Sequence, residues 1–260
     1  MDIINELLIY STLGLYAIAA IFYYLGNKNK INLLPAAFGL AIVALGFNFL
    51  SLFIRTVASG RLPLHNGYEF VLCFTFFTVL MYLFYEKYAG DTKAGTIVML
   101  VSTLLYLSIP LLMPYHINYI GNVMPALKSP WLAVHVITAI VAYCAFALAA
   151  GLAFLQIKNK TFTKDNYVYR IVITGFATLS LSIVLGAIWA EQAWGRYWSW
   201  DPKETWALVT WIVYAIYLHL NRYKNWQGSR ANILVIVGFI IVLFTFFGVN
   251  YLLSGLHSYA

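Results

Sequence analysis

The sequence predicts an all-α fold, a polytopic membrane helical bundle with about eight transmembrane helices. Of its 260 residues, 62% are apolar and only 10% are charged, and the mean hydropathy is +0.79. This composition lies far outside the usage of soluble proteins. Apolar runs of the roughly 20 residues needed to cross a hydrocarbon layer recur along the chain. They lack the alternation of a membrane barrel, and backbone polar groups must be paired within lipid, so these runs are predicted to be helices.

Eight apolar segments are predicted to span the membrane. They cover, approximately, residues 7–25, 33–54, 70–88, 94–113, 131–156, 170–190, 205–221 and 231–252. Asp2 and Glu6 precede the first segment in place of a basic region, so we interpret it as a spanning helix and not as a signal peptide. The loops leave no room for a soluble domain. Residues 1–260 are therefore predicted to form a single integral membrane domain.

The basic residues of the loops predict the orientation. Loops on one side of the predicted bundle carry eleven Lys and Arg residues, and those on the other side carry five. Because cytoplasmic loops are enriched in Lys and Arg, the termini are predicted to be N-out/C-out, and residues 191–205 to face outward. This asymmetry accounts for the formal net charge of +7, and no nucleic-acid partner is expected. Cys73 and Cys144 lie in apolar runs without C-x-x-C spacing and are interpreted as small buried residues.

Residues 191–211, EQAWGRYWSWDPKETWALVTW, hold five of the eight tryptophans. Trp and Tyr normally gather at both membrane interfaces, one or two per helix end, and Trp131 and Trp226 fit that pattern. Residues 191–211 hold too many aromatic residues for that pattern. Such a density predicts a surface for a large, flat, apolar ligand, because aromatic faces offer much contact area with few side-chain torsions. Its closely spaced aromatic residues are Trp194, Tyr197, Trp198, Trp200 and Trp206.

The sequence DPKE predicts the start of the seventh helix. Asp201 stands at the N-cap, Pro202 at the first helical position and Glu204 at the third, which is a capping-box pattern. The nearest cations are Arg196 and Lys203. Arginine suits carboxylates such as haem propionates, although basic residues beside a membrane also bind lipid headgroups.

The sequence has five histidines, and three of them are candidates for metal ligation. His219 comes 18 residues after Asp201, about 27 Å along a helix, and is predicted near the opposite face of the bilayer. His135 and His257 are predicted at the outer face, level with the tryptophans. Imidazole is a common haem ligand, and two histidines could hold a planar macrocycle from both faces. His65 and His116 lie in outer loops and are interpreted as hydrogen-bonded surface or core residues.

The segment WGRYWSWD, continuing into PKETWALVTWIVYAIYLH, resembles the WWD signature of the haem-handling membrane proteins of cytochrome c maturation. Among these it is similar to the CcsA (ResC) type of the System II pathway. SPWLAVHV resembles the family's outer histidine before the signature, YLHLNR its transmembrane histidine, and GLHSY the outer histidine of its C-terminal tail, here residues 253–260. PLHNGYEF resembles the family's outer P-x-x-N-x-Y-E loop.

The resemblance implies that haem b passes from a cytoplasmic position near His219 to an outer site, where His135 and His257 ligate the iron. There haem would be presented to the C-x-x-C-H segment of apocytochrome c. A CcsB (ResB) membrane protein is the implied partner, and the pair would have haem lyase activity without a catalytic acid, base or nucleophile from this chain. The implied location is the cytoplasmic membrane, or the thylakoid membrane of a plastid. The implied haem-binding residues of the segment are Trp194, Gly195, Arg196, Tyr197, Trp198, Trp200, Asp201 and Trp206.

Three alternatives stay open at this point. A System I haem-presenting subunit shares the tryptophan signature but passes haem to a chaperone. A small-solute transporter could gate a pore with tryptophans, although such proteins often show inverted repeats. A haem or quinone redox subunit would pair histidines at matching depths, and His219 has no evident partner at its level in this sequence.

Overall fold

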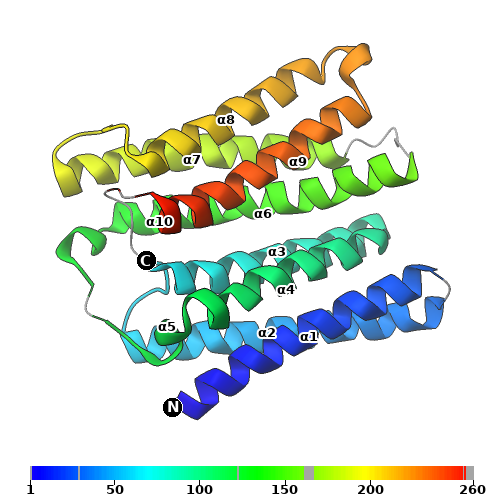
Figure 1. The fold of residues 1–260 in the computed structure, drawn as a ribbon, viewed down its shortest axis with the longest axis horizontal. Helices are drawn as coiled ribbons and strands as arrows, with labels where there is room; N and C mark the ends of the chain where they lie inside the picture. The colour runs from blue at the N-terminus through cyan, green and yellow to red at the C-terminus, as the bar shows by residue number, and fades with distance from the viewer. Residues whose placement is uncertain (1, 29, 122, 161–166, 254, 256–260) are drawn as a thin grey trace. The chain divides into compact units, whose positions relative to one another are not determined.

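The computed structural model describes residues 2–28, 30–121, 123–160, 167–253 and 255. The chain divides into two compact units, Met1–Asn122 and Val123–Ala260, and each is described by itself. Figure 1 traces the order of the helices within each unit. The described ranges contain helices and loops and no strand, which confirms the predicted all-α class.

The described residues of the first unit form four long helices and a short one. They are α1 (Asp2–Lys28), α2 (Leu34–Ser59), α3 (Gly67–Ala89), α4 (Lys93–Leu112) and α5 (Pro114–Asn118), with a 3₁₀ turn η1 (Ile31–Leu33) before α2. Asn48 of α2 is fully buried, and its amide donates to the hydroxyls of Tyr16 (3.2 Å) and Thr75 (3.1 Å). A polar group in such an interior is tolerated because it is hydrogen-bonded across helices, and these bonds help to fix how α1, α2 and α3 align.

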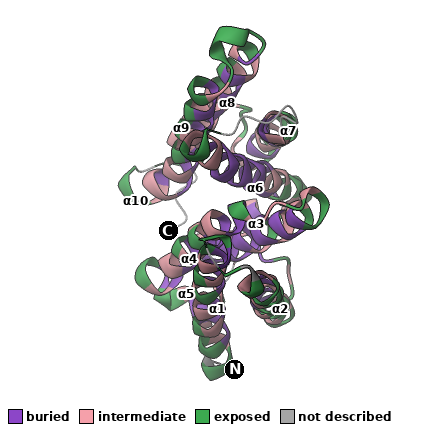
Figure 2. Ribbon diagram, turned by 90° about the vertical axis from the view of Figure 1, so that its right-hand side faces the viewer, coloured by how far each residue is buried: buried purple, intermediate pink, exposed green. Residues whose placement is uncertain are grey.

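The second unit is arranged around one long helix, α6 (Pro130–Asn159). Its other elements are η2 (Pro125–Leu127), α7 (Tyr167–Trp194), α8 (Pro202–Leu220), η3 (Lys224–Trp226), α9 (Ser229–Leu243), η4 (Phe244–Gly248) and α10 (Val249–Leu252). Residues 139–153 of α6 are almost all buried, and many are alanines that let neighbouring helices approach closely. Figure 2 shows α6 as largely buried. The Phe146 ring of α6 stacks on Tyr214 of α8 with centroids 3.6 Å apart.

The helices carry the apolar exterior of a membrane protein. Among the described residues, seven helices are long and apolar enough to cross a membrane, and together they match seven of the eight predicted segments. The remaining segment forms α8, which is a helix of 19 residues with Lys203 and Glu204 in its first turn. Large apolar side chains are exposed along several helices, among them Phe84 (66%), Leu104 (58%) and Ile240 (59%). Lipid tails would cover such residues, so the chain is a multi-pass membrane protein.

Candidate functional site

The tryptophan-rich segment begins where α7 ends. α7 runs to Trp194, and Gly195 then adopts a left-handed conformation with φ of +73° while its N–H donates to the Glu191 carbonyl (2.8 Å). Glycine suits this position because a Cβ atom would make that conformation costly. The chain therefore leaves α7 at a sharp stop and crosses to α8 in an irregular stretch.

Asp201 is a buried helix cap, as the sequence predicts. Its side chain caps the first turn of α8, and Glu204 accepts a hydrogen bond from the Asp201 N–H (3.2 Å), which completes the capping box. Glu204 also accepts from the Ser199 N–H (2.8 Å). The capping role is confirmed, and the same contacts tie the irregular stretch to the start of α8.

Between these two ends the segment exposes aromatic rings. Tyr197 and Trp200 are 61% and 68% exposed, and the rings of Trp198 and Trp200 meet edge to face with centroids 5.8 Å apart. Trp200 has a φ of +58°, a strained conformation for a residue with a large side chain. Trp206 lies one turn into α8 and packs on Phe244 (4.4 Å). Exposed aromatic faces on a strained loop favour a site for a flat apolar ligand.

His135 is held in one orientation by α7. Its Nδ1 atom lies 2.8 Å from the carbonyl oxygen of Ser182, and the Ser182 hydroxyl donates to the His135 carbonyl (3.0 Å). A carbonyl oxygen only accepts, so Nδ1 carries the hydrogen and Nε2 carries the lone pair in the neutral ring. Metal-binding histidines commonly donate their other ring N–H to such an acceptor. The donor set at His135 therefore fits haem iron.

Two residues of α7 that sequence reasoning missed shape the surroundings of this ring. Trp189 lies parallel to the His135 imidazole (11°, centroids 6.5 Å apart) and contacts Trp194 at 4.7 Å. The Trp189 indole donates to the Ala126 carbonyl (2.9 Å), which fixes its position. A Cβ atom on Gly186 would lie 2.8 Å from the imidazole, so only glycine leaves room for the ring there. Nothing in the sequence pattern singles out either residue.

The structure links some predicted residues and not others. His135, Trp189 and Trp194 are linked by ring contacts, whereas Arg196 is exposed. His219 is exposed in the last turn of α8, the far end from Asp201, and its ring meets Tyr223 at 5.7 Å.

His257 lies outside the described residues. The chain shortly before it is described at Gly255, where a Cβ atom would lie 2.5 Å from Asp201 Oδ1. The backbone at Gly255 therefore packs directly against the capping carboxylate of α8. This contact brings the start of the C-terminal tail to the tryptophan-rich segment.

The loop PLHNGYEF in the first unit is organised around a buried ionic cluster. Glu69 is fully buried and pairs with Arg55 (2.9 Å) and Arg61 (2.8 Å). His65 donates its N–H to Glu69 (2.9 Å), and the His116 carbonyl accepts from Arg55 (3.3 Å). Burial and the nearby Arg55 charge lower the pKa of His116. The His65 ring also lies in this cluster, with Nδ1 2.8 Å from Arg61 Nη1, in line with its sequence interpretation. His116 takes part through its backbone carbonyl.

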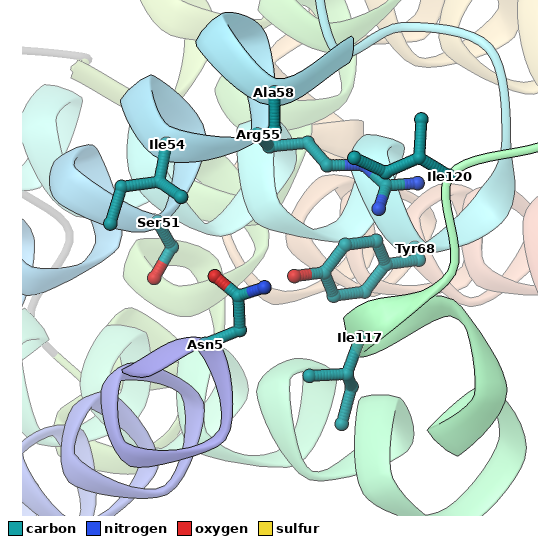
Figure 3. A pocket seen from close by; sticks show the side chains of 8 residues that line it. All are labelled: Asn5, Ser51, Ile54, Arg55, Ala58, Tyr68, Ile117 and Ile120. Carbon is teal, nitrogen blue, oxygen red and sulfur yellow. The ribbon is translucent and has the colours of Figure 1, made fainter. Parts of the chain in front are cut away.

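A small cavity lies beside this cluster, and Figure 3 shows the side chains that surround it. It has a volume of about 10 Å³, which is room for one water molecule and far too little for haem. Arg55 is 5% exposed, and its Nη2 atom has no hydrogen-bond partner among the described residues. The lining residues are Asn5, Ser51, Ile54, Arg55, Ala58, Tyr68, Ile117 and Ile120.

The fold defines a multi-pass helical membrane protein, and its tryptophan-rich segment exposes the aromatic rings of Tyr197 and Trp200. A family model described as "Cytochrome C assembly protein" matches residues 64–257. The cytochrome c biogenesis protein CcsA of Mesostigma viride is 37% identical, over 95% of this chain and 92% of that protein. The CcsA of Chlamydomonas reinhardtii is 38% identical, over 81% of this chain and 64% of that protein.

A solved structure has the same fold. The structure of "Cytochrome c Heme Lyase CcmF" aligns with a TM-score of 0.75 at 15% identity. It covers 95% of this chain, which spans only 46% of that longer protein. The chain belongs to the cytochrome c assembly protein family and is of the CcsA type. Its function therefore lies in cytochrome c biogenesis, the process that joins haem to apocytochrome c.

Proposed function

We propose that this chain is the haem-transporting and haem-presenting subunit of a System II cytochrome c synthase. The observation that carries the proposal is the orientation of His135, whose Nδ1 donates to the Ser182 carbonyl at 2.8 Å and leaves Nε2 as the lone-pair nitrogen. The ring lies beside Trp189 and Trp194, at the start of the exposed aromatic segment. Haem is the cargo and substrate of this site, and haem b is the form that carries the vinyl groups.

In this proposal His135 and His257 are the two iron ligands on the outer side of the membrane. The contact of Gly255 with Asp201 supports it, because His257 follows Gly255 by only two residues. The aromatic segment supplies the surface for the macrocycle, and Arg196 binds a propionate. The haem-contacting residues of the segment are Trp194, Gly195, Tyr197, Trp198, Trp200, Asp201 and Trp206.

The proposed inner position is His219, at the opposite end of α8 from Asp201. His219 follows Asp201 by 18 positions, which corresponds to about 27 Å of helix, close to the thickness of the hydrocarbon core. His219 is exposed on this chain, which suits a site completed by a second protein. We propose a CcsB-type membrane protein as that partner, in the cytoplasmic or thylakoid membrane, with the tryptophan-rich segment on the outer or lumenal side.

The chemistry at the outer site is the addition of two cysteine thiols of apocytochrome c to the two vinyl groups. Each sulfur bonds to one vinyl carbon and the thiol hydrogen goes to the other, so the addition involves no net oxidation. This chain contributes no acid, base or nucleophile to the reaction. Its contribution is to hold the macrocycle in one orientation next to the C-x-x-C-H segment, which raises the effective concentration of the reacting groups.

Coexpression tests the proposal. The chain, a CcsB-type partner and an apocytochrome c are produced together in cells that lack their own maturation system. Covalent c-type cytochrome is expected with the wild-type chain and is expected to be lost when His135, His219 or His257 is changed to Gly. Full cytochrome formation by all three variants would contradict the ligand assignment.

The likeness to the CcmF fold makes a System I haem-presenting subunit the second candidate. That type needs a haem chaperone, so maturation with only a CcsB-type partner present would exclude it. A purified complex without a Soret band that moves a small solute would instead favour a transporter.

A further inference from the structure

We propose that Lys203, Asn250 and the π-helical turn η4 form a clamp that positions the chain entering the C-terminal tail. The clamp lies where α8 begins, next to the tryptophan-rich segment. Lys203 Nζ donates to Asn250 Oδ1 at 2.8 Å and so joins the start of α8 to α10. The inference rests on the proposed function, because it concerns the tail that bears His257. Lys203 and Asn250 would be positioning residues that act through the tail backbone and do not touch haem.

The π turn η4 explains why Asn250 can reach Lys203. In an α-helix, residues five apart are rotated by about 140°, so they do not share a face. In η4 the Val249 N–H bonds to the Phe244 carbonyl, five residues back, and residues five apart come into line. Thr245 and Asn250 are such a pair. Without the extra residue of the π turn, only one of them could face α8.

Both residues do contact α8. The Thr245 hydroxyl lies 3.4 Å from the Trp206 carbonyl oxygen and 3.4 Å from the Thr210 hydroxyl, and Asn250 accepts from Lys203. Trp206 also packs on Phe244, the first residue of the π turn. The turn therefore attaches the last helical residues that the structure describes to the first three turns of α8 at several points.

The charge of Lys203 makes its hydrogen bond to Asn250 important for the stability of the clamp. Burial lowers the pKa of Lys203 to about 8, although the Asp201 carboxylate opposes this shift. A partly desolvated ammonium is costly unless it is hydrogen-bonded, and Asn250 supplies a neutral acceptor for it. Removing that acceptor leaves the half-buried ammonium with one hydrogen bond fewer, so the end of the chain should loosen.

The clamp has a second point of attachment five residues further on. At Gly255 a Cβ atom would lie 2.5 Å from Asp201 Oδ1, so the backbone there packs against the capping carboxylate. Asn250 and Gly255 are thus held by Lys203 and Asp201, two residues of the same helix start. The chain is therefore held at Asn250 and again at Gly255, which stands two residues before His257 in the sequence.

Asn250→Leu tests the clamp in the complex purified with its CcsB-type partner. The substitution removes the acceptor and keeps a side chain of similar size. We expect haem bound at the outer site to be retained about tenfold less tightly, as for other groups that support a metal ligand. Its low-spin absorption spectrum should weaken in the same way as in His257→Gly. Asn250→Asp keeps an oxygen acceptor for Lys203 and is expected to restore both.

Asn232→Leu is the matched control. Asn232 lies at the other end of the same helical stretch and donates to Gln156 (2.8 Å) and to the Ala153 carbonyl (3.5 Å), so this variant also loses interhelical hydrogen bonds. It should lower thermal stability and leave the haem spectrum unchanged. Lys203→Met removes the clamp from its other side and should reproduce Asn250→Leu.

The outcomes separate the clamp from the proposed function. A wild-type complex without haem would overturn the proposed function itself. If His257→Gly changes the spectrum while Asn250→Leu and Lys203→Met match the wild type, the function stands and the clamp is refuted. An equal spectral change in Asn232→Leu would also refute it, because the effect would then be general loosening.

Discussion

The substitution Gly186→Ala is expected to displace the His135 ring while leaving the histidine itself unchanged. The new Cβ atom would lie 2.8 Å from His135 Cε1 and Nδ1, whereas ordinary contact begins at 3.4 Å. The ring or α7 must therefore move by about 0.6 Å, the difference between these two distances. A ring displacement of that size along the Nδ1–Ser182 axis would lengthen the 2.8 Å hydrogen bond beyond about 3.2 Å, the usual limit.

The expected cost follows from that bond. A typical intramolecular hydrogen bond contributes about 0.5–1.5 kcal/mol, and 1.4 kcal/mol is about a tenfold change in affinity. Loss of the partner that orients a metal-binding histidine typically weakens binding by about 10- to 100-fold. Gly186→Ala should therefore weaken haem binding about tenfold. Folding stability should change little, because alanine favours the helix by up to about 1 kcal/mol and offsets part of the strain.

Two glycines provide controls for this experiment. Gly175→Ala in the same helix would collide with the Phe146 ring (2.7 Å), so it disturbs the core and not the histidine. Gly46→Ala in α2 meets nothing within 4 Å. Haem affinity is measured by titration of the purified complex, followed by Soret absorption. If Gly186→Ala binds haem as tightly as the wild type, the position of the His135 ring does not matter for binding and the reasoning is refuted.

Three further predictions concern the rest of the chain. Glu69→Gln leaves Arg55 without its buried counter-charge and should destabilise the protein by about 3–5 kcal/mol, measured by thermal unfolding; an unchanged melting temperature would contradict this. The pKa of Lys203 is about 8 in the folded protein and 10.5 in the unfolded chain, so the unfolded chain binds more protons between these pH values. The free energy of unfolding should therefore rise with pH in this range, by up to about 1 kcal/mol per pH unit. This rise should be absent in Lys203→Met. Trp200→Gly relieves backbone strain of about 1 kcal/mol, so stability should hold while haem binding falls; equal haem binding would argue against the aromatic surface.

The positions of the helices follow from local patterns that the sequence displays directly. Each of the eight apolar segments forms a helix, because the cost of unpaired backbone groups leaves no other structure for such a run in lipid. The start of α8 can also be predicted from the sequence, because Asp201, Pro202 and Glu204 are close neighbours that together cap the backbone N–H groups of the helix end. Gly60 and Gly90 also mark helix ends. Both adopt the left-handed backbone conformation, which costs glycine less than any other residue.

The arrangement around the candidate ligand depends on contacts between distant residues. His135 and Ser182 are 47 positions apart, and no periodicity relates them. Trp189 could not be distinguished from an interface tryptophan without knowing that its ring faces α6. The π turn adds one residue to a uniformly apolar helix, and its sequence does not differ from that of a regular α-helix. These features are set by the packing of α6, α7, α8 and α9.

The buried cluster of the first unit was missed for the same reason. The sequence pattern places PLHNGYEF in an outer loop, yet Glu69 of this segment is fully buried and pairs with two arginines. The buried Glu69 carboxylate is tolerated because it is paired with Arg55, which lies on a different helix. Asn66 caps α3 by accepting the Glu69 N–H at 2.8 Å, which places Glu69 in the first turn of that helix.

The central claim is that Nε2 of His135 ligates haem iron on the outer side of the membrane. The most direct test compares the absorption and electron paramagnetic resonance spectra of the wild-type complex and of His135→Gly, with and without added imidazole. We predict a low-spin, six-coordinate iron in the wild type, its loss in the variant, and its return when imidazole replaces the missing ring. A variant whose spectra equal those of the wild type without imidazole would contradict the claim.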